Sequence, residues 1–192
     1  MAEELATFLF GSNNPGKLDE VRGYADVLSV RIIGMGDVRA EVPPPRVAEV
    51  CDSYEGNARL KARAYAAWSC MPTIADDTGI EIDVLSGLPG VYTAHYGLER
   101  VQRGIYPLAI VPARFVCCMA FADQSGRCIS VTKELPGAFH RRRESDGGRP
   151  GLPYSAYFIP RGETLPLDQL VVKGFKSHRG LALQALLSVL RG

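Results

Sequence analysis

The chain has 192 residues, 46% of them hydrophobic, which is enough to bury the core of one domain. Its 22 basic residues nearly balance 21 acidic ones, which argues against a general surface for nucleic-acid polymers or anionic membranes. No apolar run reaches membrane-spanning length, and Glu3 and Glu4 stand where a signal peptide needs positive charge. Five cysteines without paired spacing are typical of a reduced protein. We therefore expect a single cytoplasmic domain over residues 1–192.

The first predicted unit is a strand, a polar loop and a helix. Thr7–Gly11 is apolar and β-prone, and hydrophobic residues recur at helical spacing from Leu18 to Leu28. Between them lies Ser12-Asn13-Asn14-Pro15-Gly16-Lys17. The N–H groups at a helix start and the lysine would suit a phosphate group. An ordinary strand–turn–helix can use the same residues.

A second strand is predicted over Val30–Ile33, followed by an extended loop from Gly34 to Asp52 with three consecutive prolines. Glu49 lies in this loop. A carboxylate at this place is either a metal ligand or one more solvated charge, and its position in the sequence leaves both readings open.

A helix is predicted from a cap at Asp52 or Ser53 to about Ser69. Asn57 and Lys61 are four residues apart, so they project from the same face of this helix. They could bind a polyanion, or they could form a pair that faces solvent.

The segment Ile74–Tyr96 has the most distinctive pattern in the chain. Asp76 and Asp77 follow a short apolar run, and a tight turn is expected at Thr78-Gly79 before an alternating strand. Adjacent acids are costly to desolvate unless a cation or a proton neutralises them. The pattern predicts either a divalent-metal site or an acidic surface turn.

The rest of the chain predicts a hairpin and a final helix. Gly97–Pro112 is poorly patterned, and we expect no helix there. Phe115–Ala122 and Cys128–Thr132 flank a turn, which indicates an antiparallel hairpin. Tyr157–Ile159 predicts a short strand, and Leu181–Leu190 predicts a helix.

Two polar segments precede the last elements. His140–Arg143 and Gly147–Gly151 form a basic, glycine-rich loop, which is either solvated or in contact with phosphate. Lys173 and then Ser177-His178-Arg179 come before the final helix. As structure this run is a capped helix start, and as chemistry it is a candidate substrate clamp.

Four segments, in the same order, resemble the inosine-triphosphatase-like family of non-canonical purine NTP pyrophosphatases. Ser12–Lys17 with Glu20 resembles its Ser/Thr-x-Asn-x-x-Lys-x-x-Glu start, and Asn57–Ala62 resembles its NAxxKA helix. Ala75–Tyr96 resembles ADDSGLxVDALxGxPGVYSARY almost position by position, and Lys173–Leu183 resembles KxxxSHRxxAL. One short motif can arise by chance, but four in register identify the chain as a member.

The resemblance implies an α/β fold in which helices flank a twisted mixed central sheet, with a cleft between two lobes. It implies Mg²⁺-dependent hydrolysis of a nucleoside triphosphate to the monophosphate and pyrophosphate. The usual substrates are deaminated purine nucleotides such as ITP, dITP and XTP. The family is usually homodimeric, so a homodimer is expected here as well.

The resemblance also implies roles for individual residues. Asp77 falls on the metal-binding general base and Glu49 on the other metal carboxylate, with Asp76 as the nearest support. This count suits Mg²⁺, which takes one or two protein carboxylates. The implied substrate contacts are Ser12, Asn13, Asn14, Pro15, Gly16, Lys17, Thr78, Lys173, His178 and Arg179. Further candidates are Glu20, Asn57, Lys61, Leu152, Tyr154 and Ser155, and His178 is assigned as a donor to the base or the phosphate.

The departures from the family pattern are concentrated in the glycine-rich GFGYDPxF segment, which here is Gly151–Phe158. Leu152 replaces an aromatic residue that is expected to stack on the purine, Pro153 replaces a glycine, and Ser155 replaces an aspartate. In addition, Gly56 stands where the helix motif usually has Glu. These changes leave two alternatives open: a pyrophosphatase with altered base specificity, or a catalytically weakened nucleotide-binding homologue.

Overall fold

A six-stranded sheet in the order β2-β1-β3-β4-β5-β6 forms the centre of the fold. The computed structural model describes residues 5–141 and 151–192. β1 pairs in parallel with β2 and β3, and the remaining neighbours are antiparallel, so the expected mixed central sheet is confirmed. The strands are β1 Thr7–Phe10, β2 Arg31–Gly34, β3 Thr73–Ile82, β4 Ile110–Ala122, β5 Cys128–His140 and β6 Phe158–Pro160.

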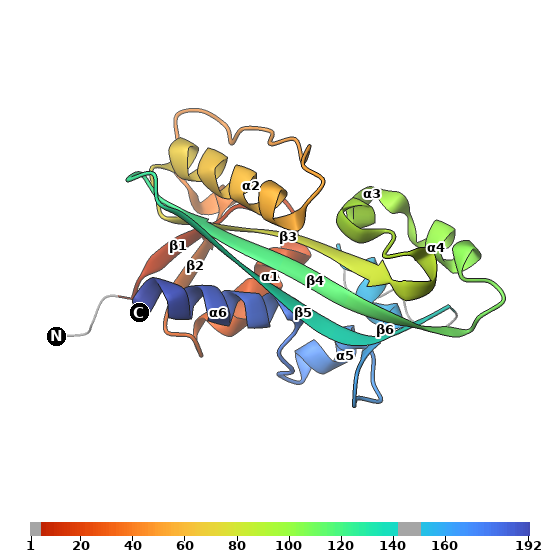
Figure 1. The fold of residues 1–192 in the computed structure, drawn as a ribbon. Coiled ribbons are helices and arrows are strands. Elements are labelled where there is room, and N and C mark those ends of the chain that lie inside the picture. Colours follow the sequence, from red (N-terminus) through yellow and green to blue (C-terminus); the bar gives the residue numbers. More distant parts are fainter. Residues whose placement is uncertain (1–4, 142–150) are drawn as a thin grey trace.

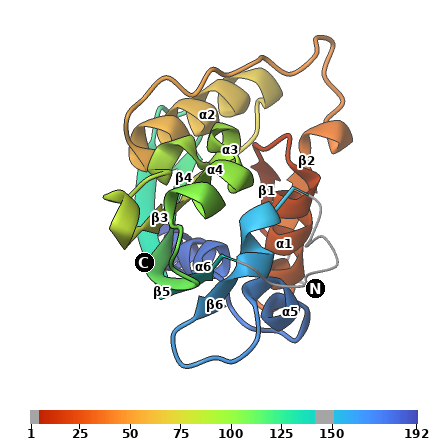
Figure 2. The same cartoon turned by 90° about the vertical axis from the view of Figure 1, so that its right-hand side faces the viewer.

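Helices cover both faces of this sheet, as Figures 1 and 2 show. α2 lies on one face, whereas α1 and α6 pack together on the other. α3 and α4 lie beyond α2 at one end of the sheet, and α5 lies near β6. The helices are α1 Pro15–Ala25, α2 Tyr54–Ser69, α3 Thr93–Tyr96, α4 Leu98–Gly104, α5 Leu167–Val172 and α6 His178–Arg191.

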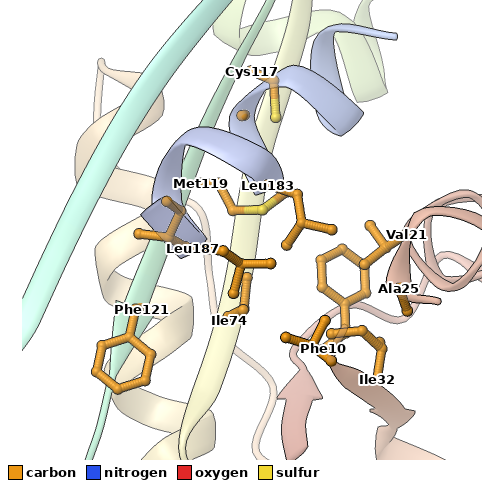
Figure 3. Packing of buried hydrophobic residues seen from close by; sticks show 13 residues of the cluster. Phe10, Val21, Ala25, Ile32, Ile74, Cys117, Met119, Phe121, Leu183 and Leu187 are labelled. Atoms are coloured by element: carbon orange, nitrogen blue, oxygen red, sulfur yellow. The ribbon is translucent and has the colours of Figure 1, made fainter. Parts of the chain in front are cut away.

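Side chains that are adjacent along β3 and β4 face different helices. Ile74 and Cys117 belong to the core that β1, α1 and α6 complete, which Figure 3 shows from close by. Ala75 and Cys118 belong to the core on the opposite face, where α2 contributes alanines. Because strand side chains alternate between faces, one step along β3 moves a side chain from one helix layer to the other.

A separate core lies farther along the same strands. There Ile80 of β3 packs with Phe115 of β4, Phe139 of β5 and Phe158 of β6. Leu167 of α5 joins them. The long strands β3 and β4 therefore connect two packed regions, as the expectation of two lobes requires.

Most of the predicted elements are present. The strands near residues 7 and 31, the helix capped by Ser53, the 115–132 hairpin and the final helix are all confirmed. The hairpin strands extend well beyond Thr132, to His140. Ser177 caps a helix that begins at His178 rather than at Leu181. Of the predicted basic loop, residues 142–150 lie outside the described part of the chain.

The predicted turn at Thr78-Gly79 is wrong, because β3 runs without a break from Thr73 to Ile82. Gly79 serves a close approach rather than a turn. A Cβ on Gly79 would lie 2.0 Å from the carbonyl oxygen of Gly90 and 2.7 Å from the hydroxyl of Tyr54. Glycine is therefore needed at this strand position to admit the neighbouring backbone.

The prediction that residues 97–112 lack a helix is also wrong, since α4 spans Leu98–Gly104. Val101 and Ile105 bury the apolar side of this segment in the core with Phe139. α5 was not predicted either. Among the described segments, no helix has both the length and the apolar character to cross a membrane.

Candidate active site

A cleft of about 930 Å³ lies between the loop that joins β1 to α1, helix α2 and the 151–155 segment. Most of the site residues predicted from the sequence line it, although they come from six separate parts of the chain. Those lining the cleft are Ser12, Asn13, Asn14, Pro15, Lys17, Glu20, Glu49, Lys61, Asp77, Thr78, Leu152, Tyr154, Ser155, His178 and Arg179.

Hydrogen bonds of Asn14 fix the loop between β1 and α1, which lies at a helix N-terminus suited to an anion. Asn14 caps α1 by accepting a hydrogen bond at Oδ1 from the backbone N–H of Lys17 at 3.3 Å. Its Nδ2 donates to the carbonyl oxygen of Gly151 at 2.8 Å, which ties the loop to the far wall of the cleft. The N-terminus of a helix favours negative charge, and Lys17 adds a full positive charge.

Asp76 points toward α1 and α6, where positive charges surround it. Its Oδ2 accepts hydrogen bonds from Lys17 Nζ at 3.0 Å, Arg179 Nε at 3.2 Å and Thr78 Oγ1 at 2.6 Å. Burial alone would raise the pKa of Asp76, but Lys17 and Arg179 hold it well below its ordinary value. Arg179 also pairs with the buried Glu20 at 2.6 Å. Asp76 is therefore a permanently ionised part of a buried network.

Asp77 points the other way, toward α2. Asn57 Nδ2 donates to its Oδ2 at 3.1 Å, and Lys61 Nζ lies 3.7 Å from its Oδ1. Burial raises the pKa of Asp77, Lys61 opposes this effect, and the nearby carboxylate of Glu49 adds to it. Asp77 is therefore closer to accepting a proton than Asp76 is. The expectation that Asp76 directly supports Asp77 is not met, because the two side chains face different helices.

Lys61 also forms an ion pair with Glu49, so one ammonium group pairs with both candidate metal carboxylates. A cation between these acids stands where the sequence predicted a metal ion. Among the described residues, no group of three His, Cys, Asp or Glu side chains forms a metal cluster. Mg²⁺ does not need one, because it completes its shell with water and phosphate oxygens. Glu49 and Asp77 therefore fit a magnesium site. The buried, paired Lys61 rules out the alternative of a solvent-facing pair with Asn57.

The other end of the cleft is largely apolar. The imidazole of His178 stacks on the ring of Phe115, with ring centroids 4.4 Å apart and planes within 5°. Burial, and then Arg179, lowers the pKa of His178 well below its ordinary value, so the ring is neutral. Neither ring nitrogen has a hydrogen-bond partner among the residues that the structure describes. A neutral ring with free polar atoms, stacked on an aromatic, can contact a planar ligand by hydrogen bonds.

The 151–155 segment contributes little polarity to this end. Ser155 Oγ donates to the carbonyl oxygen of Leu152 at 2.6 Å, so the hydroxyl is engaged within its own short helical turn. Tyr154 is buried, and burial raises the pKa of its phenol to about 12. The Ser155 hydroxyl, which stands where the family segment GFGYDPxF has an aspartate, is thus directed to the backbone.

Four predicted residues do not line the cleft. Gly16, Asn57 and Asp76 are buried behind it, where the last two hold lining residues in place. Lys173 ends α5 as an exposed side chain away from the cleft.

The sequence missed the apolar wall. Phe115 was assigned only to a hairpin strand, and Leu167 and Val171 of α5 were not assigned at all, yet all three line the cleft. The signal for α5 was present in the apolar residues Leu167, Leu170 and Val171 at helical spacing after Pro166. No such signal existed for Phe115, whose place depends on the pairing of β3 with β4.

The chain is similar to several known proteins. A model of the Ham1 family matches residues 8–189. A dITP/XTP pyrophosphatase of Nocardia farcinica is 35% identical over 97% of this chain and 95% of its own length. A dITP/XTP pyrophosphatase of Deinococcus deserti is 34% identical over 91% of this chain and 85% of its own length. The structure of the Staphylococcus aureus Ham1 protein superposes with a TM-score of 0.76 at 26% identity, covering 97% of this chain and 98% of that one.

Proposed function

This chain belongs to the Ham1 family, and we propose that it hydrolyses the triphosphates of non-canonical purine nucleosides to the monophosphate and pyrophosphate. The substrates are ITP, dITP and XTP. Full-length relatives named dITP/XTP pyrophosphatase support this activity. The reaction breaks the anhydride bond between the α- and β-phosphates, and water supplies the hydroxyl group and the proton.

One observation supports the proposal above the others. Two carboxylates from distant segments, Glu49 and Asp77, flank the ammonium group of Lys61 in a cleft that also contains Lys17 and the start of α1. Anionic and cationic groups in one cleft suit a polyphosphate with its metal ion. Phosphoryl transfer depends mainly on positioning and on neutralising charge, and these groups supply both.

The residues of the chain have separate tasks in this reaction. The N–H groups at the start of α1 and the Lys17 ammonium bind phosphate oxygens. Asp77, whose pKa is raised by burial, takes the proton from the attacking water. Glu49 and Asp77 would hold Mg²⁺, which when bound neutralises phosphate charge. Phe115 and His178 form a wall for the base.

Pyrophosphate release over a panel of nucleotides tests the proposal. With Mg²⁺ present, dITP, ITP and XTP are expected to be turned over with a higher kcat/KM than dATP, dGTP, dCTP and dTTP. Omission of Mg²⁺ with added chelator should abolish the release. A folded protein that turns over none of these nucleotides would contradict both the activity and the assigned roles.

The 151–155 segment supports a second candidate, a pyrophosphatase with altered base choice. Leu152 lines the cleft without an aromatic face, and the Ser155 hydroxyl is engaged by the backbone. Leu152→Phe should then lower the KM for ITP, since base–aromatic stacking is worth about 1–3 kcal/mol. An unchanged KM would mean that residue 152 does not contact the base. Preference for a pyrimidine nucleotide in the same panel would favour this candidate.

The proposal also covers the domain organisation, the location and the oligomeric state of the protein. The chain forms one domain over residues 1–192, a proposal supported by the single sheet that its described strands form. It acts in the cytoplasm. It forms a homodimer, which light scattering on the purified protein would test.

A further inference from the structure

The side-chain amide of Asn57 joins the two segments that carry Glu49 and Asp77. Its Oδ1 accepts a hydrogen bond from the backbone N–H of Cys51 at 2.9 Å. Its Nδ2 donates to the carbonyl oxygen of Cys51 at 3.1 Å and to Asp77 Oδ2 at 3.1 Å. Asn57 is only 2% exposed, and both N–H groups of the amide are in use.

The contact with Cys51 is where the segment carrying Glu49 is attached to α2. Residues 43–51 have neither helix nor strand, so no sheet or helix hydrogen bonds hold Glu49 in place. Cys51 follows Glu49 by two residues and packs against the first turn of α2. A Cβ on Gly56 would lie 2.7 Å from the Cβ of Cys51 and 2.9 Å from its Sγ.

Lys61 of α2 also pairs with Glu49 itself, and a further attachment of this segment lies farther from the acids. Trp68, in the last turn of α2, donates from Nε1 to the carbonyl oxygen of Val42 at 2.8 Å. Val42 is seven residues before Glu49, whereas Cys51 is two residues after it. The two ends of one segment are thus held by Asn57 and Trp68 of one helix, and of these two residues only Asn57 contacts Asp77.

We infer that Asn57 is a positioning residue that sets the separation and orientation of Glu49 and Asp77 and thereby the affinity of the site for Mg²⁺. The inference rests on the proposed function. Asn57 does not line the cleft, so it acts through the two acids and not on the substrate. Such supporting contacts typically change metal affinity or activity by about 10–100-fold when they are removed.

Replacing Asn57 by Leu tests this role, because leucine has the same shape and makes none of the three hydrogen bonds. The control is Trp68→Phe, which frees the other end of the same segment. Three quantities are measured: amide hydrogen exchange at Cys51, the Mg²⁺ concentration that half-saturates the rise in Tm without nucleotide, and the KM for dITP at saturating Mg²⁺.

In Asn57→Leu the half-saturating Mg²⁺ concentration should rise about tenfold. Exchange at Cys51 should become much faster, while the KM for dITP at saturating Mg²⁺ stays within about twofold, as expected for a residue that does not touch substrate. Trp68→Phe should lower Tm and leave the half-saturating concentration unchanged. An Asn57→Leu protein that loses Tm but keeps its Mg²⁺ response would reduce Asn57 to a structural residue and overturn the inference.

Wild-type protein alone also tests the inference if Asn57→Leu does not fold. The Cys51 amide should exchange far more slowly than its neighbours from Val47 to Val50, and equal exchange would overturn the attachment. A Tm that does not respond to Mg²⁺ would overturn the effect on the metal. These measurements need no turnover. A protein that passes them yet hydrolyses no nucleotide would therefore contradict the proposed function alone.

Discussion

Asp76 and Asp77 are adjacent along β3, but the alternation of the strand gives them opposite surroundings. Asp76 is paired with Lys17 and Arg179 on the side of α1 and α6. Asp77 shares one ammonium group with Glu49 on the side of α2. The first carboxylate pairs with two cations, whereas the second keeps a raised pKa and faces the cleft. The geometry therefore places Asp76 within a buried ion-pair network and leaves Asp77 facing the cleft, as its proposed role requires.

The assignment of Asp77 predicts that Asp77→Asn loses turnover without losing the fold. An amide can still accept the hydrogen bond from Asn57, so Tm should stay within a few degrees. It cannot take a proton, and loss of a general base lowers rates by about 10²–10⁴-fold. Pyrophosphate release and thermal melts monitored by circular dichroism measure the two effects. Rates near those of the wild type would refute the role of Asp77.

Asp76→Asn should instead destabilise the protein. The change leaves the buried Arg179 with Glu20 as its one remaining carboxylate and removes the ion-pair partner of Lys17. Breaking a buried ion pair by removing one partner costs about 3–5 kcal/mol. Urea unfolding measures the loss. Asp83→Asn, at an exposed residue a few positions farther along, should leave the free energy of unfolding unchanged.

The pH dependence of this loss provides a second readout. The folded pKa of Asp76 lies below its unfolded value, so its contribution is complete above about pH 4 and shrinks as the pH falls toward the folded pKa. The difference in unfolding free energy between wild type and Asp76→Asn should narrow by about 1 kcal/mol from pH 5 to pH 3. A constant difference over this range would mean that Asp76 is not held ionised by the fold.

At the scale of elements, hydrophobic periodicity predicted the long amphipathic helices. Capping residues, Ser53 and Ser177, and apolar residues at helical spacing predict α2 and α6, and both helices are present. α3 and α4 have four and seven residues and no side-chain cap, so local sequence offers little to identify them. α4 exists because Val101 and Ile105 are buried against other elements, and Tyr96 of α3 packs against the same core. Tertiary packing decides such short helices.

The glycines of β3 and α1 should respond in opposite ways to alanine. Gly79→Ala would drive a Cβ into the backbone of Gly90, at 2.0 Å, and should destabilise by about 1–3 kcal/mol through overpacking. Gly23→Ala, in α1 with nothing within 4 Å, should stabilise by about 0.5–1 kcal/mol. Urea unfolding of both variants makes the comparison. Destabilisation of equal size in both would show that the approach of Gly90 to β3 is not close.

For the whole molecule, the sequence predicted the polar parts of the candidate site better than its apolar parts. Lys17 and Asp77 lie in patterned segments, so they could be found one at a time, whereas Glu49 lies in an extended loop and was assigned only through the resemblance. Their meeting in one cleft, and the stacking of His178 on Phe115, depend on sheet pairing between residues far apart in the chain. Pairing of this kind leaves no local pattern.

Because one sheet carries helices on both faces, we expect the two helix layers to unfold together. Cys117 and Cys118 are adjacent on β4, with α6 covering the first and α2 covering the second. Both thiols are free and buried, and burial raises the pKa of Cys117 to about 12, whereas Cys70 is exposed. Only the thiolate reacts, so a thiol reagent should label Cys70 first.

If the two faces form one cooperative unit, Cys117 and Cys118 gain reactivity only through global unfolding. Their labelling rates should then rise in parallel as urea is added, with the same dependence as the free energy of unfolding. Fragmentation of the labelled peptide by mass spectrometry separates the two sites. Faster labelling of Cys118 at low urea would mean that α2 leaves the sheet before α6 does. The Asn57 attachment and both carboxylates contacting Lys61 would then be lost in that partly open state, while the network around Asp76 would remain.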